Sequence, residues 1–371
     1  MNNIDRRQWL KSIGLAGTMA FINPAQLLSN DSPASYGGSK SELIKLNFNE
    51  NPYGPSKSVR QAMNSTFDNV CRYPFSDLKE LVKNIAAKEG VTEDHIVVTG
   101  GSTEGLRATA LTYGSGSGEI IAAHPTFQAM LNYAENLGAY VHRVPVNEKM
   151  EHDLEGMAAR VTNKTRLIFL CNPNNPTGTL LDKEKIQDFC NSLENKAVIF
   201  SDEAYYDYIT EPEYPSMVEL VKEGKNIIVS KTFSKVYGLA GIRIGYLIAR
   251  PDIADILKKN IMAMTNVLAI AAANEALQED DFYKFSIAKN MEAKQLIYKT
   301  LDRLKLDYIP SHTNFVFFHS NQHINELSSK MINEGVAIGR PFPPLYDWAR
   351  ISTGTVEQTN SFCLALEKVY S

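Results

Sequence analysis

Short apolar runs alternate with segments of helical periodicity along the chain from Leu43 onward. The runs have the length and composition of buried strands, and between them apolar residues recur at intervals of three and four. Strands are predicted at residues 96–98, 119–123, 140–144, 167–170, 197–200 and 227–229, and helices at residues 78–88, 127–137 and 182–193. This alternation is typical of a mainly parallel sheet that is covered by helices on both faces.

The pattern changes after about Arg250, where longer helical segments follow one another. The elements predicted there are helices over 253–277 and 282–306, strands at 315–318 and 350–352, and a closing helix. We therefore predict an α/β fold with a large domain over residues 71–250 and a smaller α+β domain over residues 251–371. Residues 41–70 are expected to form an N-terminal arm.

The composition is that of a soluble globular protein, with 44% apolar and 22% charged residues among 371. The length suggests two domains, at roughly 100–200 residues each. Lysine and arginine number 38 against 42 aspartate and glutamate, which gives a net charge of −4. Because no basic excess is present to neutralise nucleic-acid phosphates, we do not expect a nucleic-acid partner.

Cysteine and histidine spacing gives no metal motif. The four cysteines form no C-x-x-C pair, and the seven histidines include no H-E-x-x-H. His319 and His323 are four residues apart, but the Ser-Asn-Gln between them indicates a loop rather than a helix face. We therefore expect no metal site and interpret the cysteines as scattered buried thiols.

Residues 1–40 resemble a twin-arginine export signal followed by a linker. Arg6 and Arg7 precede an apolar segment over 13–22, and 32–34 offers a weak cleavage site. The apolar segment has ~10 residues, whereas a spanning helix needs ~20, so a membrane anchor is not expected. This pattern predicts an exported, periplasmic protein. The alternative is a cytoplasmic protein whose N-terminal helix carries a chance arginine pair.

A lysine surrounded by hydroxyl groups follows the strand predicted at 227–229. Thr232 and Ser234 lead into Lys235, and Arg243 comes eight residues later. Such a group suits a cofactor with an aldehyde and a phosphate, because the amine can form a Schiff base while the hydroxyls and the guanidinium hold the phosphate. Taken alone, Lys235 is equally compatible with an ordinary surface lysine.

Polar groups also follow the two preceding predicted strands. Asp202 lies at the end of the run over 197–200, where ligands bind in open α/β sheets. A protonated pyridine nitrogen would be a suitable partner for its carboxylate, and a helix N-cap is the alternative role. The turn over 171–178 contains Asn175, whose amide could donate to an anionic oxygen. By composition alone this segment is only a turn.

The segment 98–106 predicts a strand, a glycine turn and a helix start, which is a favourable place for an anion. Ser102 stands where a dinucleotide fingerprint requires its second glycine, and the segment matches neither G-x-x-x-x-G-K nor G-x-S-x-G. Support for a dinucleotide, a nucleotide P-loop or a serine nucleophile is therefore lost, and a phosphate group remains.

Together these motifs resemble the class I/II pyridoxal-phosphate aminotransferases of fold type I. GGSTEG, PTF, NPNNPTG, DEAY, TFSK, GIRIGY and RISTGT occur in the family's order over residues 43–371. The segments NENPYG and RYP, near residues 49 and 72, are most similar to the histidinol-phosphate aminotransferase branch. The resemblance implies a large domain with a mainly parallel sheet, a smaller α+β domain and the cofactor pyridoxal 5'-phosphate.

The resemblance also implies how the cofactor would be held. Lys235 would attach to it covalently, Asp202 would pair with the pyridine nitrogen, and Tyr205 would bond the phenolic oxygen; these three are the expected catalytic residues. The other expected cofactor contacts are Asn175 on the phenolic oxygen, Phe127 stacked on the ring, and Ser102, Thr103, Thr232, Ser234 and Arg243 on the phosphate.

The substrate and the partner subunit are implied in the same way. Tyr73 would reach the phosphate from the other subunit of a homodimer with shared sites, and residues 41–70 would serve the small domain or the dimer contact. Arg350 would bind the substrate carboxylate with both guanidinium nitrogens, beside Asn175. Tyr53 and Arg340 would bind a substrate phosphate. Arg340 lies in the proline-rich segment 338–344, which is unlike the usual family sequence, so its side chain could point elsewhere.

The implied reaction moves an amino group from a small-molecule donor to a 2-oxo acid by ping-pong kinetics, with the freed Lys235 amine as general base. Histidinol phosphate is one candidate donor, and aromatic or other L-amino acids are the alternative. A decarboxylase or racemase on the same scaffold also stays open. The missing glycine fingerprint argues against a nicotinamide oxidoreductase. A cofactor-sensing DNA-binding regulator would need a module before residue 43, where the chain is too short and polar.

Overall fold

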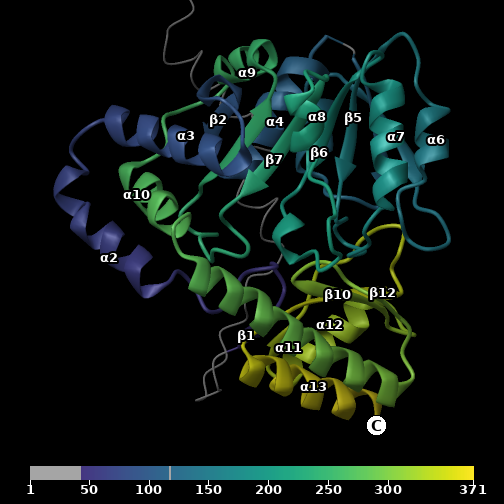
Figure 1. The fold of residues 1–371 in the computed structure, drawn as a ribbon. Helices are drawn as coiled ribbons and strands as arrows, with labels where there is room; N and C mark the ends of the chain where they lie inside the picture. Colours follow the sequence, from purple (N-terminus) through teal and green to yellow (C-terminus); the bar gives the residue numbers. More distant parts are fainter. Residues whose placement is uncertain (1–42, 117) are drawn as a thin grey trace, which may run out of the picture. The chain divides into compact units, whose positions relative to one another are not determined.

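A seven-stranded sheet forms the centre of the large domain in the computed structural model, which describes residues 43–116 and 118–371 (Figure 1). The strand order is β2-β8-β7-β6-β5-β3-β4. The strands are β2 (Ile96–Thr99), β3 (Glu119–His124), β4 (Tyr140–Pro145), β5 (Thr165–Cys171), β6 (Val198–Asp202), β7 (Ile227–Thr232) and β8 (Gly245–Ala249). Neighbours are parallel except at β8, which is antiparallel to β2 and β7. The predicted α/β fold with a mainly parallel sheet is confirmed.

Side chains of the central strands alternate between two apolar clusters, one on each face of the sheet. In β3, Ile121 belongs to the first cluster and Ile120 to the second, because successive strand side chains point to opposite faces. In β5, Ile168 and Phe169 divide in the same way. Both faces are therefore packed, and the strand ends are left to form a site.

Helices cover the two faces in two groups. The cluster of Phe169 includes side chains from α4 (Ser102–Gly114), α5 (Ala129–Asn136) and α9 (Pro251–Lys258). The cluster of Ile168 includes side chains from α2 (Lys57–Ser65), α3 (Phe75–Glu89), α6 (Leu154–Ala158), α7 (Lys183–Leu193), α8 (Val218–Lys222) and α10 (Val267–Ala276). Three short 3-10 helices complete this region: η1 (Phe67–Asn69), η2 (Glu93–His95) and η3 (Tyr206–Tyr208).

The predicted continuous helix over 253–277 is wrong. The chain forms α9, leaves the helix over 259–266, and begins α10 where the Asn266 side chain accepts the Ala269 amide. Apolar periodicity cannot detect such a cap when both helices are apolar. Both helices follow the predicted domain boundary at residue 250, yet their buried side chains belong to the clusters of the large sheet.

Strand β8 was not among the predicted strands. It follows the GIRIG segment directly, and all of its residues are buried. No helix separates β8 from β7, so the alternation of apolar runs and helices that identifies the other strands does not mark it.

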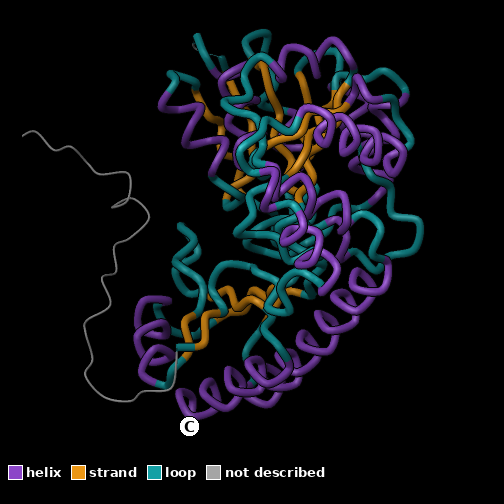
Figure 2. The backbone as a smooth tube through the Cα atoms, turned by 90° about the vertical axis from the view of Figure 1, so that its left-hand side faces the viewer, coloured by secondary structure: helices purple, strands orange, loops and turns teal. Residues whose placement is uncertain are grey.

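The small domain contains an antiparallel sheet in the order β12-β10-β9. Its strands are β9 (Tyr308–Ile309), β10 (Phe315–His319) and β12 (Trp348–Ser352), and its helices are α11 (Asp280–Leu304), α12 (Ile324–Asn333) and α13 (Val356–Tyr370). Figure 2 shows these strands as a second orange group, apart from the large sheet. A parallel pair, β1 (Ile44–Lys45) and β11 (Val336–Ala337), joins the start of the arm to this domain.

The expected export signal and linker lie in residues 1–40, outside the described residues. Of the helices in the described part of the chain, none is long and apolar enough to cross a membrane. Residues 43–116 and 118–371 contain no group of three or more His, Cys, Asp or Glu side chains suited to a metal ion.

Candidate active site

Three neighbouring parallel strands end at the same edge of the large sheet. Strand β5 leads into the turn that contains Asn175, β6 ends at Asp202, and β7 ends at Thr232, three residues before Lys235. In an open α/β sheet the carboxyl ends of the strands are where ligands bind. The sheet order therefore brings polar groups from distant parts of the sequence to one place.

Lys235 points toward the N-terminal arm. Its Nζ atom donates a hydrogen bond to the carbonyl oxygen of Asn49 at 2.8 Å and lies 5.4 Å from the centre of the Tyr205 ring. Burial lowers the pKa of Lys235 to about 8, and the Arg350 guanidinium adds to this shift. A substantial fraction of the amine is therefore neutral, and nucleophilic, slightly above neutral pH.

Asp202 is a buried carboxylate, with only 2% of its surface exposed. Its Oδ1 atom accepts the Ala204 amide at 3.2 Å. Burial raises the pKa of Asp202 to about 7, although the Ala204 amide and the Lys235 amine oppose this shift. Asp202 forms no salt bridge with the described residues, and a buried acid of this kind is a suitable partner for a cationic ring nitrogen.

The Tyr205 hydroxyl accepts hydrogen bonds from two side-chain amides. Its hydroxyl oxygen accepts from Nδ2 of Asn49 at 2.8 Å and from Nδ2 of Asn175 at 3.3 Å. Burial raises the pKa of Tyr205, so the phenol is neutral and keeps its proton for donation. The same two amides therefore hold the hydroxyl in one orientation, from which it can donate to an anionic oxygen.

Arg350 extends from the small domain into this group. Its Nη1 atom donates to Oδ1 of Asn175 at 2.6 Å, and its Nη2 atom donates to the Asn47 carbonyl oxygen at 2.9 Å. Its buried Nε atom has no partner among the described residues. Burial lowers the pKa of Arg350 to about 10, and the nearby Arg340 adds to this. A buried guanidinium with a free N–H is suited to an anionic ligand.

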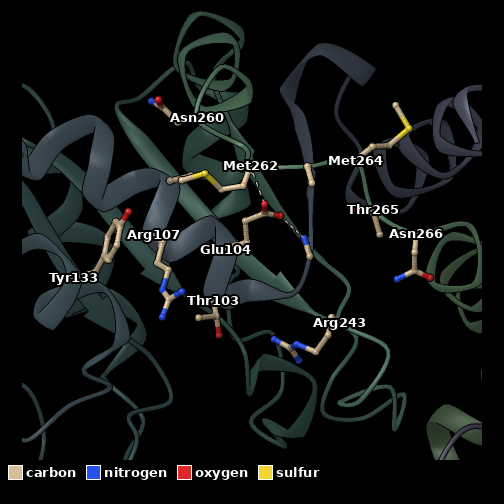
Figure 3. A pocket seen from close by; sticks show the side chains of 13 residues that line it. Thr103, Glu104, Arg107, Tyr133, Arg243, Asn260, Met262, Met264, Thr265 and Asn266 are labelled. Carbon is tan, nitrogen blue, oxygen red and sulfur yellow. Dashed lines mark hydrogen bonds between the residues drawn. The ribbon is translucent and has the colours of Figure 1, made fainter. Parts of the chain in front are cut away.

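A second group of residues forms a cradle at the start of α4. Ser102 and Thr103 are the first two residues of this helix, where backbone amides have no helical acceptors. The Arg243 guanidinium occupies the space that a Cβ on Gly101 would need. In Figure 3, Arg243 points toward the start of α4, on the side where Thr103 lies. Backbone amides, hydroxyls and a cation together fit a phosphate.

Strand pairing connects this cradle to the lysine loop. Thr232 pairs with Gly245 across β7 and β8, and a Cβ on Gly245 would meet the Ser102 amide nitrogen at 2.9 Å. The Thr232 hydroxyl oxygen accepts the Ser234 amide at 3.1 Å, which shapes the turn before Lys235. The glycine is therefore required for the close approach of α4 to the end of β7.

Three other predicted site residues pack against apolar side chains. Phe127 is half-buried between β3 and α5 and packs on the second apolar cluster. Tyr53, on the arm, makes an edge contact with Phe285 at 5.0 Å between ring centres. Tyr73 is 81% exposed, and the ring beside it is Phe75, at 6.1 Å. The single chain therefore does not bring Tyr73 into contact with the other site residues.

Arg340 is connected to Arg350 through an aromatic ring. The Phe342 ring lies 4.6 Å from the Arg340 guanidinium carbon and 4.7 Å from that of Arg350. Arg340 is otherwise exposed, and its Nη1 atom donates to the Pro341 carbonyl oxygen at 3.0 Å. No carboxylate of the described residues forms a salt bridge with either arginine. The pair is therefore a region of uncompensated positive charge.

Sequence reasoning missed the role of Asn49 and Ser352. Asn49 contacts both Lys235 and Tyr205. The Ser352 hydroxyl donates to Oδ1 of Asn49 at 3.0 Å and accepts a hydrogen bond from the Asn49 backbone amide at 2.8 Å. Asn49 has a φ of 56°, a left-handed conformation that asparagine tolerates better than most residues. Its place in the NENPYG segment marks a turn, but nothing in the segment indicates which strand the turn would face.

Comparisons with known proteins identify the family of this chain. Residues 41–366 match the family model described as aminotransferase class I and II. The histidinol-phosphate aminotransferase of Moorella thermoacetica is 36% identical, over 88% of this chain and 86% of its own. That of Caldicellulosiruptor saccharolyticus is 34% identical, over 88% and 92%. The structure of histidinol-phosphate aminotransferase from Sinorhizobium meliloti in complex with pyridoxal-5'-phosphate superposes with a TM-score of 0.82 at 25% identity, covering 89% of this chain and 91% of that one. The chain therefore belongs to the class I and II aminotransferase family and is a pyridoxal phosphate-dependent aminotransferase.

Proposed function

We propose that Lys235 is the attachment point of the cofactor and the group that carries the substrate proton. Its Nζ atom lies beside the Tyr205 ring, and burial lowers the pKa of this amine to about 8. Pyridoxal phosphate supplies an aldehyde that captures amines and a conjugated ring that accepts electron density. The Lys235 amine, once released by an incoming donor, removes the proton from the donor's Cα atom.

The other residues hold the cofactor in the orientation that this proton transfer needs. Asp202 would accept a hydrogen bond from the protonated ring nitrogen, and its buried carboxylate would favour that protonation. Tyr205 would donate a hydrogen bond to the ring oxygen, as would the amide of Asn175. Phe127 would stack on the ring. The residues that would hold the phosphate are Ser102, Thr103, Thr232, Ser234 and Arg243.

The donor is an amino compound with an anionic group, and we propose an amino-alcohol phosphate such as histidinol phosphate, with a 2-oxo acid as acceptor. The single observation that carries this proposal is the pair of cations close to one ring, Arg340 and Arg350 against Phe342. An anionic group beside them would compensate a charge that has no carboxylate partner among residues 43–116 and 118–371. Tyr53 lies on the arm and would add a hydroxyl. The names of the relatives support the same donor class.

Other L-amino acids, aromatic ones included, are a second candidate class of donor. Arg340 is bonded to its own segment at the Pro341 carbonyl, and its exposed position does not require a ligand. Arg350 alone would then bind the carboxylate of a donor that carries no phosphate.

Two experiments test the proposal. Borohydride reduction of the holoenzyme followed by peptide mass mapping should find the cofactor on Lys235; an unmodified Lys235 contradicts the assignment. A screen of donors in single turnover, with histidinol phosphate among them, should yield pyridoxamine phosphate and a carbonyl product. Release of carbon dioxide without pyridoxamine phosphate would instead indicate a decarboxylase, and inverted donor without it a racemase.

A homodimer with shared sites is part of the proposal. Apolar side chains are exposed on the segment around η1 and at the start of α3, with Phe67 and Val70 at 55%, Tyr73 at 81% and Phe75 at 67%. A surface of this kind is typical of an interface. Tyr73 would reach the cofactor phosphate of the other subunit. Mixing inactive Lys235→Ala and Tyr73→Ala chains should restore one intact site per heterodimer; no restored activity would contradict shared sites.

Export by a twin-arginine signal is likewise proposed, on the Arg6-Arg7 pair and the short apolar segment. The family match begins at residue 41, so the signal region precedes the matched part of the chain. Replacing both arginines by lysine should retain the protein in the cytoplasm. An unchanged distribution between cytoplasm and periplasm would favour the cytoplasmic alternative.

A further inference from the structure

Glu104 connects two segments that are far apart in the sequence. It is the third residue of α4, and each of its carboxylate oxygens accepts one backbone amide. Oε2 accepts from Gly100 at 2.5 Å, and Oε1 accepts from Met262 at 3.0 Å. Figure 3 shows the carboxylate between these two segments, with a dashed line to each.

The first segment is the turn that begins the phosphate cradle. The Glu104 carboxylate accepts a hydrogen bond from the Gly100 amide, and the Thr99 carbonyl oxygen accepts one from the Gly101 amide at 2.8 Å. The next two amides, of Ser102 and Thr103, stand at the first two positions of the helix, where no helical acceptor exists for them. Because the Gly100 and Gly101 amides are bonded in this way, the Ser102 and Thr103 amides are the ones that an anion can reach.

The second segment is the connection over 259–266, where α9 and α10 are separated. It lines a pocket of about 540 Å³ together with α4 and Arg243. This connection has another bond to α4, from Nδ2 of Asn260 to Oγ1 of Thr112 at 2.7 Å. Thr112 lies ten residues beyond Ser102, roughly 15 Å along the helix axis.

Helix capping alone does not explain this geometry. A glutamate at the third helical position commonly bonds an amide just before the helix, as Oε2 does here. The bond from Met262 comes from 158 residues away and adds nothing to the cap. A carboxylate one turn from a phosphate site would also repel the phosphate, unless its charge is already engaged by donors.

We propose that Glu104 is a positioning residue for the cofactor phosphate. It acts by hydrogen bonding both the Gly100–Ser102 turn and the connection over 259–266, which holds the two segments together. The inference rests on the proposed role of this turn and Arg243 in holding that phosphate. With both hydrogen bonds of Glu104 intact, the turn keeps the Ser102 and Thr103 amides directed at the phosphate oxygens. Without them, the turn and the pocket wall move independently and the cofactor is held less firmly.

The test is the rate at which the holoenzyme loses its cofactor, followed by absorbance after dilution into inorganic phosphate. Glu104→Ala should lose pyridoxal phosphate roughly tenfold faster than the parent, because two hydrogen bonds from backbone amides to a carboxylate are removed. Glu104→Gln keeps one oxygen acceptor and should fall between them. The turnover rate per loaded site should stay within about twofold, because Glu104 touches no reacting atom.

Asn260→Ala is the matched control, because it loosens the same connection at the far end of α4. Its cofactor loss should equal that of the parent. An equal rate in Glu104→Ala and the parent, or equal acceleration in Glu104→Ala and Asn260→Ala, would overturn the inference. Should Glu104→Ala not fold, the shorter Glu104→Asp provides the same comparison. Arg243→Ala is measured alongside: if it too releases cofactor at the parental rate, the proposed phosphate site itself is wrong.

Discussion

The guanidinium of Arg350 donates a hydrogen bond from Nη1 to Oδ1 of Asn175 across 2.6 Å, although the two residues are 175 positions apart. Arg350 belongs to β12 of the small domain, and Asn175 to the turn after β5 of the large sheet. Asn175 also donates to the Tyr205 hydroxyl at 3.3 Å. The proposed carboxylate-binding group and the proposed cofactor-binding phenol are therefore connected through one amide side chain.

Arg350→Lys should mainly weaken donor binding. A lysine has no planar fork, so it cannot bond Asn175 and the donor carboxylate in the same geometry. We expect kcat/KM for the donor to fall about 100-fold, roughly 2.7 kcal/mol, with most of the change in KM. Steady-state kinetics measures this. Arg143→Lys, at the Arg143–Glu135 surface pair, is the control and should match the parent. An unchanged KM in Arg350→Lys would contradict the assignment.

Arg340→Ala distinguishes the two candidate donor classes. If Arg340 binds a second anionic group, a phosphate-bearing donor should lose about 10- to 50-fold in kcat/KM, whereas a monoanionic amino acid should lose little. Phe342→Leu should give a smaller loss with the same selectivity, because the Arg340 and Arg350 guanidinium groups lie 4.6 and 4.7 Å from its ring. Parallel kinetics with both donors measures this selectivity. Equal losses for the two would indicate that Arg340 serves the fold rather than the donor.

The parallel part of the large sheet could be predicted because its strands are apolar runs separated by helices. The antiparallel β8 and the interruption between α9 and α10 could not. Strand β8 follows β7 without an intervening helix, so the strand–helix alternation does not mark it. The helix interruption depends on the Asn266 cap and on Glu104 accepting the Met262 amide. Both features are set by tertiary contacts rather than by local periodicity.

The motifs that follow β5, β6 and β7 indicated the chemistry, because hydroxyls, acids and a lysine at strand ends are rarely placed there for packing alone. What they could not indicate was the contribution of the arm. Asn49 faces Lys235 because β1 pairs with β11, about 290 residues later in the chain, and because Ser352 of β12 bonds Asn49. Likewise, no local signal connects Phe342 to Arg350, since their contact depends on how the proline-rich segment folds back.

The reactivity of Lys235 should depend on pH around 8. Burial lowers the pKa of this amine to about 8 from its usual 10.5, so the neutral, nucleophilic form accumulates as pH rises through 8. The rate at which apoenzyme captures pyridoxal phosphate should therefore rise about tenfold per pH unit below 8 and level off above it. Stopped-flow absorbance measures this rate. A rate that keeps rising to pH 10 would show that the amine has an ordinary lysine pKa.

Asp202→Asn should make the apoenzyme more stable and the holoenzyme less active. Burial raises the folded-state pKa of Asp202 to about 7, whereas its unfolded value is 3.8. The contribution of Asp202 to stability is therefore fully present below about pH 4. It is lost as pH rises through 7, where the native state must hold a buried charge. Urea unfolding of the two apoenzymes should differ by ~2 kcal/mol or more at pH 8 and converge near pH 4. A constant difference across this range would assign the effect to something other than ionisation.

Lys231 holds together a group of buried acids behind Asp202, and its removal should be strongly destabilising. Its Nζ atom lies 2.8 Å from Oε2 of Glu89 and 3.8 Å from Oε2 of Glu203, the residue that follows Asp202. These acids raise the pKa of Lys231 despite its burial, so it is charged throughout the range in which the protein folds.

Lys231→Met removes the cation and leaves the Glu89 and Glu203 carboxylates buried without it. Breaking a buried pair in this way costs about 3–5 kcal/mol, whereas breaking an exposed pair costs about 0–1 kcal/mol. Urea unfolding of apoenzyme at pH 7 should separate Lys231→Met from Arg143→Met, which breaks the half-exposed Arg143–Glu135 pair. Adding Glu89→Gln to Lys231→Met should recover part of the loss, because one uncompensated charge is removed with it. If Lys231→Met lowers the unfolding free energy by no more than Arg143→Met does, the acids behind Asp202 are neutral in the native state and need no counter-charge.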